Sequence, residues 1–128
     1  MAARGKANEQ PVIATTCANP DQNWNDQNWA FESGARTSYA LRNVHGSRGK
    51  CVTGRIGQDA RLFACQKWSD QEWYVDFGDK GSGRFMIRNR HTGDVCLAVQ
   101  GDAAVERLVV QLPCDERIRN QWWKWVAP

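Results

Sequence analysis

The sequence predicts an all-β domain made of three repeats. A Gln-x-Trp triplet occurs three times, and its tryptophans, Trp29, Trp73 and Trp123, are spaced 44 and 50 residues apart. A cysteine stands a short polar segment before each triplet. Between glycine-containing turns, apolar side chains recur at every second residue, as in Trp73, Val75 and Phe77, which is typical of strands with one buried face. A propeller would need about four such repeats or more.

Length and composition place the chain among ordinary globular domains. It has 128 residues, of which 41% are apolar and 24% charged, so residues 1–128 have room for a single domain with one core. The longest apolar run, Val95–Val99, is far shorter than the roughly twenty residues that span a bilayer. The net charge of +3 is scattered along the chain, and this does not indicate nucleic acid as a partner.

The repeats occupy about residues 10–31, 37–77 and 84–126. The second and third repeats open on an aromatic-x-aliphatic-Arg-Asn segment. Each continues through a glycine-containing turn, a Cys-aliphatic pair, a polar loop and an apolar stretch that ends in a second cysteine. The first repeat is 15 to 21 residues shorter. It begins where the others are already half complete, so we expect it to lack their opening strand and their first cysteine.

Five cysteines in a chain of this size indicate disulfides. No C-x-x-C pair occurs, and the two histidines, His45 and His91, occupy equivalent turn positions, so zinc, haem and thioredoxin-like chemistry are not indicated. We therefore expect no metal and no cofactor. Because disulfides persist in an oxidising compartment, the sequence predicts a secreted, extracellular protein.

The three triplets, the cysteine before each of them and the two Arg-Asn strands resemble the ricin-type lectin family. The resemblance runs from about Gln10 to Val126, nearly the whole chain. It implies a β-trefoil of three four-stranded units, in which Trp29, Trp73 and Trp123 fill the shared core. The triplet glutamine would support the backbone or the edge of a sugar pocket.

The same resemblance implies two disulfides, each inside its own repeat. Cys51 would bond Cys65, and Cys96 would bond Cys114. Loops of this size contribute roughly 3 kcal/mol in the chain-entropy model. Cys17 is then left without a partner. Three explanations stay open: an upstream segment completes the first repeat, another chain supplies the strand, or Cys17 is a small buried apolar residue.

In sugar-binding repeats of this family, an Asp follows the first cysteine by two residues, and an aromatic precedes the second by two. Rings stack on the apolar face of a sugar, while carboxylates and amides bind its hydroxyls. The Asp is absent from both complete repeats, where Thr53 and Ala98 stand. Phe63 keeps the ring in the second repeat, whereas Thr15 and Leu112 stand at that position in the others.

The Asn-Gln pair that opens the triplet in this family is the third element of the sugar site. It is intact as Asn120-Gln121 in the third repeat and is Asp70-Gln71 in the second. The second repeat is the best candidate pocket because it alone keeps a ring, and Asp70 would replace the lost carboxylate. The candidate sugar-binding residues are Phe63, Asp70, Gln71, Asn120 and Gln121.

Two further tryptophans indicate an interaction surface. Trp24 and Trp68 each lie five residues before a triplet tryptophan, inside polar loops, where a large aromatic is more often exposed than in a strand. Packing over the end of a hairpin is the other interpretation, and the sequence does not choose between the two.

The sequence predicts a non-catalytic protein. Acidic pairs such as Asp115-Glu116 are interpreted as solvated loop charges, since nothing places two carboxylates across a cleft. Our leading hypothesis is a lectin-like module of a secreted protein that binds a glycan or glycoconjugate. The alternative is a protein-interaction or cell-binding trefoil subunit of a toxin complex, similar to the accessory subunits of cytolethal distending toxins, with sugar binding lost. An inhibitor or purely structural trefoil is a third possibility.

Overall fold

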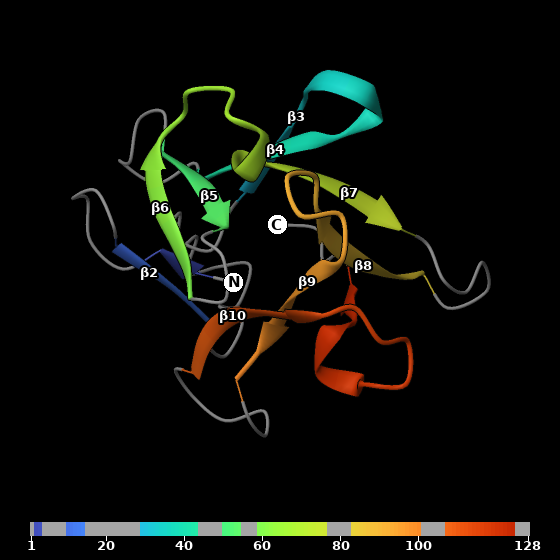
Figure 1. The fold of residues 1–128 in the computed structure, drawn as a ribbon. Helices are drawn as coiled ribbons and strands as arrows, with labels where there is room; N and C mark the ends of the chain where they lie inside the picture. The colour runs from blue at the N-terminus through green and yellow to red at the C-terminus, as the bar shows by residue number, and fades with distance from the viewer. Residues whose placement is uncertain are drawn as a thin grey trace.

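The fold was analysed in a computed structural model of the chain, which describes residues 2–3, 10–14, 29–43, 50–54, 59–76, 83–100 and 107–124. For residues 2–3, 10–14 and 107 only the backbone is described. The described residues form eleven strands and three short 3-10 turns, and Figure 1 shows the strands wound around a common centre. No helix in the described ranges is long and apolar enough to cross a membrane.

The second and third units contain four strands each. Those of the second unit are β4 (Tyr39–Asn43), β5 (Lys50–Gly54), β6 (Ala60–Ala64) and β7 (Glu72–Asp76). Those of the third are β8 (Arg84–Asn89), β9 (Val95–Val99), β10 (Arg107–Pro113) and β11 (Trp123–Lys124). The prediction of an all-β trefoil with Gln-x-Trp units is confirmed.

The first unit contains three described strands: β1 (Ala2–Ala3), β2 (Gln10–Ala14) and β3 (Trp29–Ser33). β1 pairs antiparallel with β2, as β5 pairs with β6 and β9 with β10, so β1 stands at the position of a second strand. β3 pairs with β4 as β7 pairs with β8. The strand that the described part of this unit lacks is its opening one, as the repeat lengths predicted.

Opening and closing strands form the barrel wall, and the remaining strands form three hairpins. Antiparallel pairing runs along the wall in the order β3, β4, β7, β8 and β11. The hairpins contact one another in a closed triangle, because β2 pairs with both β6 and β10 and Asp59 bridges to Val110. Within the described residues, β3 and β11 are the two ends of the wall, and the missing opening strand would lie between them.

The core is centred on Trp73, which is fully buried on β7. Side chains from both complete units pack around it: Leu41, Val52, Ala60, Leu62, Phe85, Ile87, Leu97 and Val109. Trp29 and Trp123 pack against this cluster but are only half-buried. β7 has a neighbouring strand on both sides, whereas β3 and β11 each have one among the described strands. This difference in neighbours accounts for the difference in burial.

Two disulfides each fasten a hairpin to the loop before its triplet. Cys51 bonds Cys65 with Cα atoms 5.2 Å apart, and Cys96 bonds Cys114 with Cα atoms 5.0 Å apart. These are the pairs that the family resemblance implied. Cys17 lies outside the described residues.

Candidate functional site

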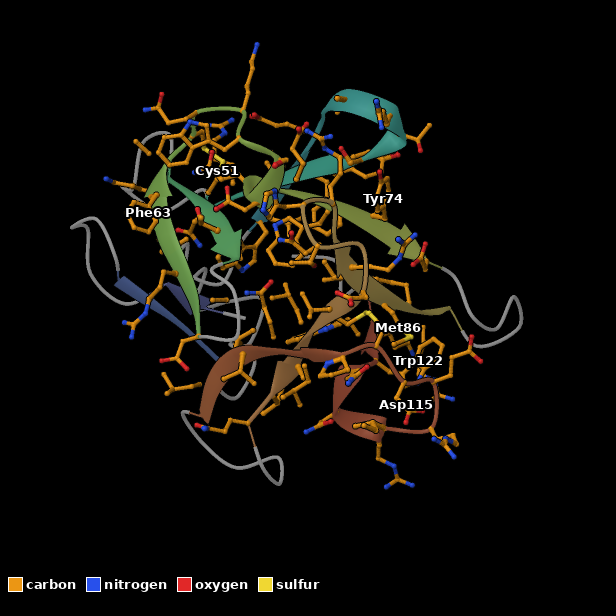
Figure 2. All side chains as sticks on the ribbon, viewed as in Figure 1. Cys51, Phe63, Tyr74, Met86, Asp115 and Trp122 are labelled. Carbon is orange, nitrogen blue, oxygen red and sulfur yellow. A yellow bond between two sulfur atoms is a disulfide. The ribbon has the colours of Figure 1, made fainter. Side chains whose placement is uncertain are left out.

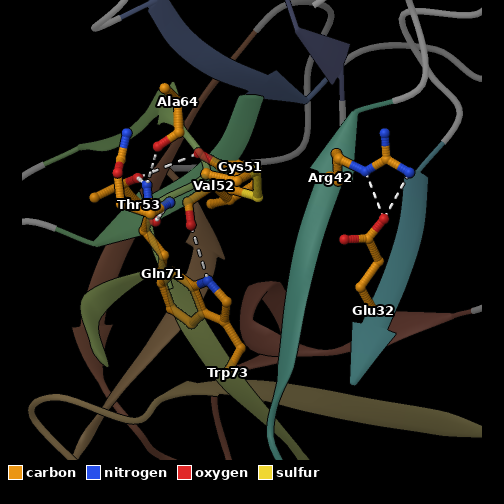
Figure 3. The surroundings of a disulfide bond; sticks show 10 residues. Glu32, Arg42, Cys51, Val52, Thr53, Ala64, Gln71 and Trp73 are labelled. Atoms are coloured by element: carbon orange, nitrogen blue, oxygen red, sulfur yellow. Dashed lines mark hydrogen bonds and ion pairs between the residues drawn. A yellow bond between two sulfur atoms is a disulfide. The ribbon is translucent and has the colours of Figure 1, made fainter. Parts of the chain in front are cut away.

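The predicted sugar residue Gln71 is part of the internal scaffold. It ends the turn η3 (Ser69–Gln71) and is 1% exposed. Its Oε1 accepts a hydrogen bond from the Gln66 amide at 2.7 Å. Its Nε2 donates to the Ala64 carbonyl at 2.9 Å and to Thr53 Oγ1 at 3.0 Å (Figure 3). Since both N–H groups are buried and bonded inside the protein, Gln71 has no donor left for a sugar hydroxyl in this arrangement.

Gln121 repeats this arrangement in the third unit, at the end of η4 (Arg119–Gln121). It is fully buried, its Oε1 accepts from the Asp115 amide at 2.8 Å, and its Nε2 donates to the Pro113 carbonyl at 2.8 Å. The neighbouring Asn120 donates from Nδ2 to the Val99 carbonyl at 2.6 Å. The Asn-Gln pair, intact in the sequence, therefore holds its loop against β9 and β10.

The triplet tryptophans complete the same scaffold. The indole of Trp73 donates to the Val52 carbonyl at 3.1 Å (Figure 3), and that of Trp123 donates to the Leu97 carbonyl at 3.1 Å. Val52 and Leu97 each follow the first cysteine of their unit. A buried indole N–H needs an acceptor, and these carbonyls provide it. The triplets of the two complete units thus tie their closing strands to the cysteine-bearing strands.

The position at which sugar-binding repeats carry an Asp is buried in both complete units. Thr53 is 2% exposed; its hydroxyl donates to the Cys51 carbonyl at 3.2 Å and accepts the hydrogen bond from Gln71. Ala98, at the equivalent position in the third unit, is fully buried and has no polar side-chain atom. Neither position supplies an acceptor to a ligand.

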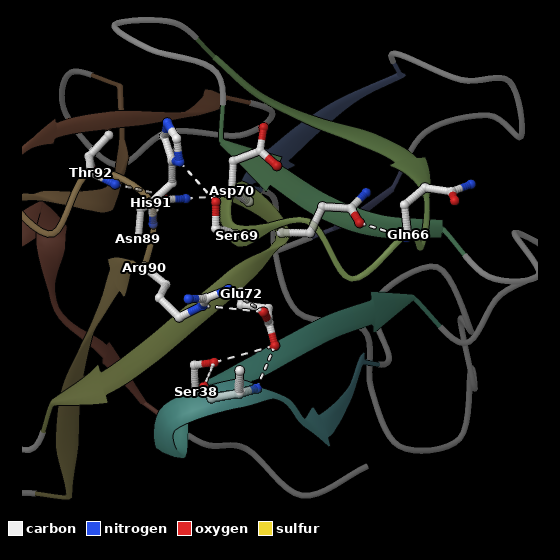
Figure 4. A network of polar contacts seen from close by, with 11 residues as sticks. Ser38, Gln66, Ser69, Asp70, Glu72, Asn89, Arg90, His91 and Thr92 are labelled. Carbon is white, nitrogen blue, oxygen red and sulfur yellow. Dashed lines mark hydrogen bonds and ion pairs between the residues drawn. The ribbon is translucent and has the colours of Figure 1, made fainter.

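Three of the predicted sugar residues, Phe63, Asp70 and Asn120, are half-buried, and Oδ1 of Asp70 is buried. Phe63 is half-buried, and Figure 2 shows it on the outer side of β6. Asp70 is half-buried in η3, and its backbone carbonyl accepts from Asn89 Nδ2 at 3.2 Å. Figure 4 shows its carboxylate pointing away from the neighbouring residue Glu72. In the third unit, the half-buried Leu112 stands where Phe63 does.

A cleft of about 400 Å³ lies beside the Cys51–Cys65 disulfide, and the sequence did not predict it. Of the candidate sugar residues it contains only Gln71. Its lining comes from β3 and the turn after it, from the disulfide, and from both sides of η3: Glu32, Ser33, Gly34, Ala35, Ala40, Cys51, Cys65, Lys67, Gln71, Glu72 and Arg90. The sequence signal that could have found it is the middle residue of the triplet, which is charged only in the second unit.

Glu72 organises one wall of this cleft (Figure 4). Its side chain is 6% exposed and forms an ion pair with Arg90 at 2.8 Å. It also accepts from the Ala35 amide at 2.8 Å and from Ser38 Oγ at 3.5 Å. Gly34 approaches so closely that a Cβ there would overlap the carboxylate. The buried charge is thus compensated, as a carboxylate out of water requires.

The backbone on both sides of the cleft is strained. The turn η2 (Ala35–Thr37) holds Arg36 at φ 55° and Thr37 at φ 62°. Across the cleft, Lys67 is held at φ 60°. Residues other than glycine and asparagine seldom adopt this left-handed region, and a β-branched residue such as threonine adopts it least. Strain of this kind persists where surrounding contacts impose it, and it is common at functional sites.

Trp68 is 52% exposed and Ile118 is 37% exposed. Each stands directly before the 3-10 turn of its unit, so they occupy equivalent places. Of the two interpretations that the sequence left open for Trp68, the exposed side chain is the one that the structure has. Trp24 lies outside the described residues.

Two polar pairs on the surface hold turns in place. Ser69 Oγ and His91 Nδ1 are hydrogen-bonded at 2.8 Å in an exposed position. Asp115 contacts Arg117 at 3.0 Å, and this side-chain hydrogen bond lowers the pKa of Asp115. No group of three or more His, Cys, Asp or Glu residues that could hold a metal occurs in the part of the chain that the structure describes.

A β-trefoil whose closing strands carry Gln-x-Trp, with each complete hairpin stapled by a disulfide, has the architecture of a lectin scaffold. The sequence model of the ricin-type beta-trefoil lectin domain matches residues 1–123, and the chain belongs to that family. No curated protein matches the chain.

Solved structures share this fold at low sequence identity. A designed 3-fold symmetric protein, ThreeFoil, is 20% identical with a TM-score of 0.80, covering 97% of this chain and 86% of its counterpart. The cytolethal distending toxin of Haemophilus ducreyi is 22% identical with a TM-score of 0.79, covering 99% and 76%. That of Actinobacillus actinomycetemcomitans is 21% identical with a TM-score of 0.79, covering 99% and 83%. At such identities the likeness concerns the fold alone.

Proposed function

We propose that the chain is a non-catalytic carbohydrate- or glycoconjugate-binding module of a secreted protein. The observation that carries this proposal is the match to the lectin family over residues 1–123, with the Gln-x-Trp scaffold built as described above. Two disulfides support an extracellular location, because such bonds persist in oxidising compartments.

The neutral sugar site of this proposal lies in the second unit, around Phe63 and Asp70. The ring would stack on a sugar face, and the carboxylate would accept hydrogen bonds from hydroxyls. Because Thr53 and Gln71 are engaged inside the protein, this shallow site has few polar groups to offer. We expect a dissociation constant on the order of millimolar, which corresponds to about 4 kcal/mol.

A glycan array followed by titration tests this proposal. Phe63→Ala is expected to abolish binding of the best neutral glycan, since stacking needs a ring. Leu112→Ala changes the equivalent position of the third unit and serves as the matched control, with binding retained. Tight monovalent binding that is indifferent to Phe63→Ala would contradict this assignment of the pocket.

A protein-interaction subunit, resembling those of toxin complexes, is the second candidate. The observation that favours it is the half-exposed Trp68, together with the closed Asp positions at Thr53 and Ala98. Exposed aromatics are enriched at the centres of protein interfaces. β3 and β11 each have one neighbouring strand among the described residues, and a strand of a partner subunit could pair with either.

Parallel assays separate the two candidates. Trp68→Ala is expected to weaken binding of a purified partner protein while leaving glycan binding intact, and Ile118→Ala is the matched control in the third unit. A complete absence of glycan binding on the array, together with a partner that depends on Trp68, would favour the interaction subunit.

A further inference from the structure

The lining of the disulfide cleft carries two acids, Glu32 and Glu72, and two bases, Lys67 and Arg90, and both acids are already ion-paired. Glu32 forms an ion pair with Arg42 at 2.6 Å, and Glu72 forms one with Arg90 at 2.8 Å. Lys67 is exposed and has no ion pair or hydrogen bond in the described part of the chain. Both carboxylates of the lining are therefore matched, while one ammonium group is available to a ligand.

Lys67 is held at the cleft by contacts on both sides of it in the chain. Cys65 is bonded to Cys51, and the Gln66 amide donates to Gln71 Oε1 at 2.7 Å. On the other side, the Trp68 carbonyl accepts from the Gln71 amide at 2.9 Å. These contacts hold the backbone of Lys67 in its left-handed conformation at the edge of the cleft, and its side chain is exposed.

The third unit places different groups at the equivalent segment. Glu116 corresponds to Lys67, because Gln66 and Asp115, the residues before them, donate to the triplet glutamines in the same way. Trp122, the middle residue of the third triplet, extends its indole to the Glu116 carbonyl, with a hydrogen bond of 2.9 Å. Where the second unit has a cleft beside a cation, the third has an indole packed against the segment that carries an acid.

We propose that the disulfide cleft of the second unit binds the anionic substituent of an acidic sugar, a carboxylate or a sulfate, through the Lys67 ammonium. This proposal rests on the proposed glycan-binding function and adds to it a ligand class and a second contact site. The cleft volume of about 400 Å³ is within the range of small-molecule sites. Charge-assisted hydrogen bonds to such an anion are about twice as strong as neutral ones.

The test compares sugars that differ only in the anionic group. Methyl glucuronide is titrated beside methyl glucoside, and galactose 6-sulfate beside galactose, by isothermal calorimetry at low and at physiological salt. We expect one acidic sugar to bind about tenfold more tightly than its neutral match, as the strength of charged hydrogen bonds implies. The pair that shows the preference distinguishes carboxylate from sulfate, and salt should weaken it.

Three variants locate the effect. Lys67→Ala is expected to remove the preference, and Lys67→Arg to keep it. Lys124→Ala makes the same charge change on the exposed end of β11, away from the cleft, and should have no effect. Melting temperatures of all three variants verify folding, and if Lys67→Ala is unfolded, Lys67→Gln takes its place.

Several results would overturn the proposal. One is an absence of acid preference in the unmodified protein, and another is a preference that survives Lys67→Ala. Equal losses in Lys67→Ala and Lys124→Ala would show an effect of net charge only and would also overturn it. If neutral sugars bind, and this binding depends on Phe63 but not on Lys67, the glycan-binding function is supported and only the cleft proposal fails. The failure of the cleft proposal can therefore be distinguished from the failure of the proposed function.

Discussion

The second and third units build the same scaffold and place different groups on it. In both, the triplet glutamine accepts from the residue after the second cysteine, and the triplet tryptophan donates to the residue after the first. The middle residue of the triplet differs: Glu72 holds the turn η2 between β3 and β4, whereas Trp122 donates to a carbonyl of its own loop. The outer residues of the triplet thus make the same contacts in both units, and the middle residue is the one whose contacts differ.

The largest expected effect is a difference in unfolding free energy between variants of the triplet tryptophans. Trp73→Ala should cost about 3 to 5 kcal/mol of unfolding free energy, because it empties a fully buried aromatic site. Trp123→Ala should cost less, since that ring is half-buried at the end of the described wall. Trp68→Ala should cost under about 1 kcal/mol because Trp68 is a surface residue. Urea denaturation measures all three, and equal losses would show that Trp68 is also a core residue.

The two disulfides should contribute nearly equally. Removing Cys51–Cys65 or Cys96–Cys114 by paired alanine substitutions opens loops of 14 and 18 residues, for which chain entropy predicts roughly 3 kcal/mol each. A much larger loss for the second unit would indicate that its bridge also holds the cleft wall through Cys65 and Lys67. Thermal unfolding of the two double variants makes the comparison.

The fold was readable from the sequence because its signals are local and repeated. Strand periodicity, glycine-containing turns and the phase of the three triplets predicted the units, and the short first repeat predicted that its described part would contain no opening strand. The unequal burial of the triplet tryptophans could not be predicted from the sequence. It depends on how many strands flank β3, β7 and β11, which is a property of the assembled wall.

The site was less predictable for a similar reason. A motif names residue types but does not say whether a side chain faces a ligand or its own backbone. Gln71 and Asn120 have the right chemistry for a sugar, and both donate hydrogen bonds to carbonyls of their own unit. The cleft depends on left-handed backbone at Lys67, which has no sequence signature. It also depends on the reach of Glu72 to the turn between β3 and β4, for which the charged middle residue of the triplet is the sequence signal.

Replacing Lys67 by glycine should stabilise the protein while removing its acid preference. Glycine adopts φ 60° without strain, so Lys67→Gly is expected to raise the unfolding free energy by up to about 1 kcal/mol. The equivalent change in the third unit, Glu116→Gly, should lower it by about 0.5 to 1 kcal/mol, because Glu116 does not have a positive φ. Denaturation curves of the two variants should therefore shift in opposite directions. A shift in the same direction would show that strain at Lys67 is not stored in the folded state.

The smallest expected effect is a pH dependence that only the third unit carries. The hydrogen bond from the Arg117 side chain lowers the pKa of Asp115, whereas the equivalent residue of the second unit, Gln66, does not titrate. A carboxyl with a lowered folded pKa stabilises the fold above its unfolded pKa of about 3.9, and this contribution is lost as the pH falls through the folded value. Asp115→Asn keeps an acceptor for the Arg117 amide and removes the charge. Unfolding free energies at low salt should therefore differ slightly between the variant and the unmodified protein at neutral pH and converge once the pH falls below the lowered folded pKa. A difference that persists undiminished in acid would assign the effect to the lost geometry of the turn instead of the charge.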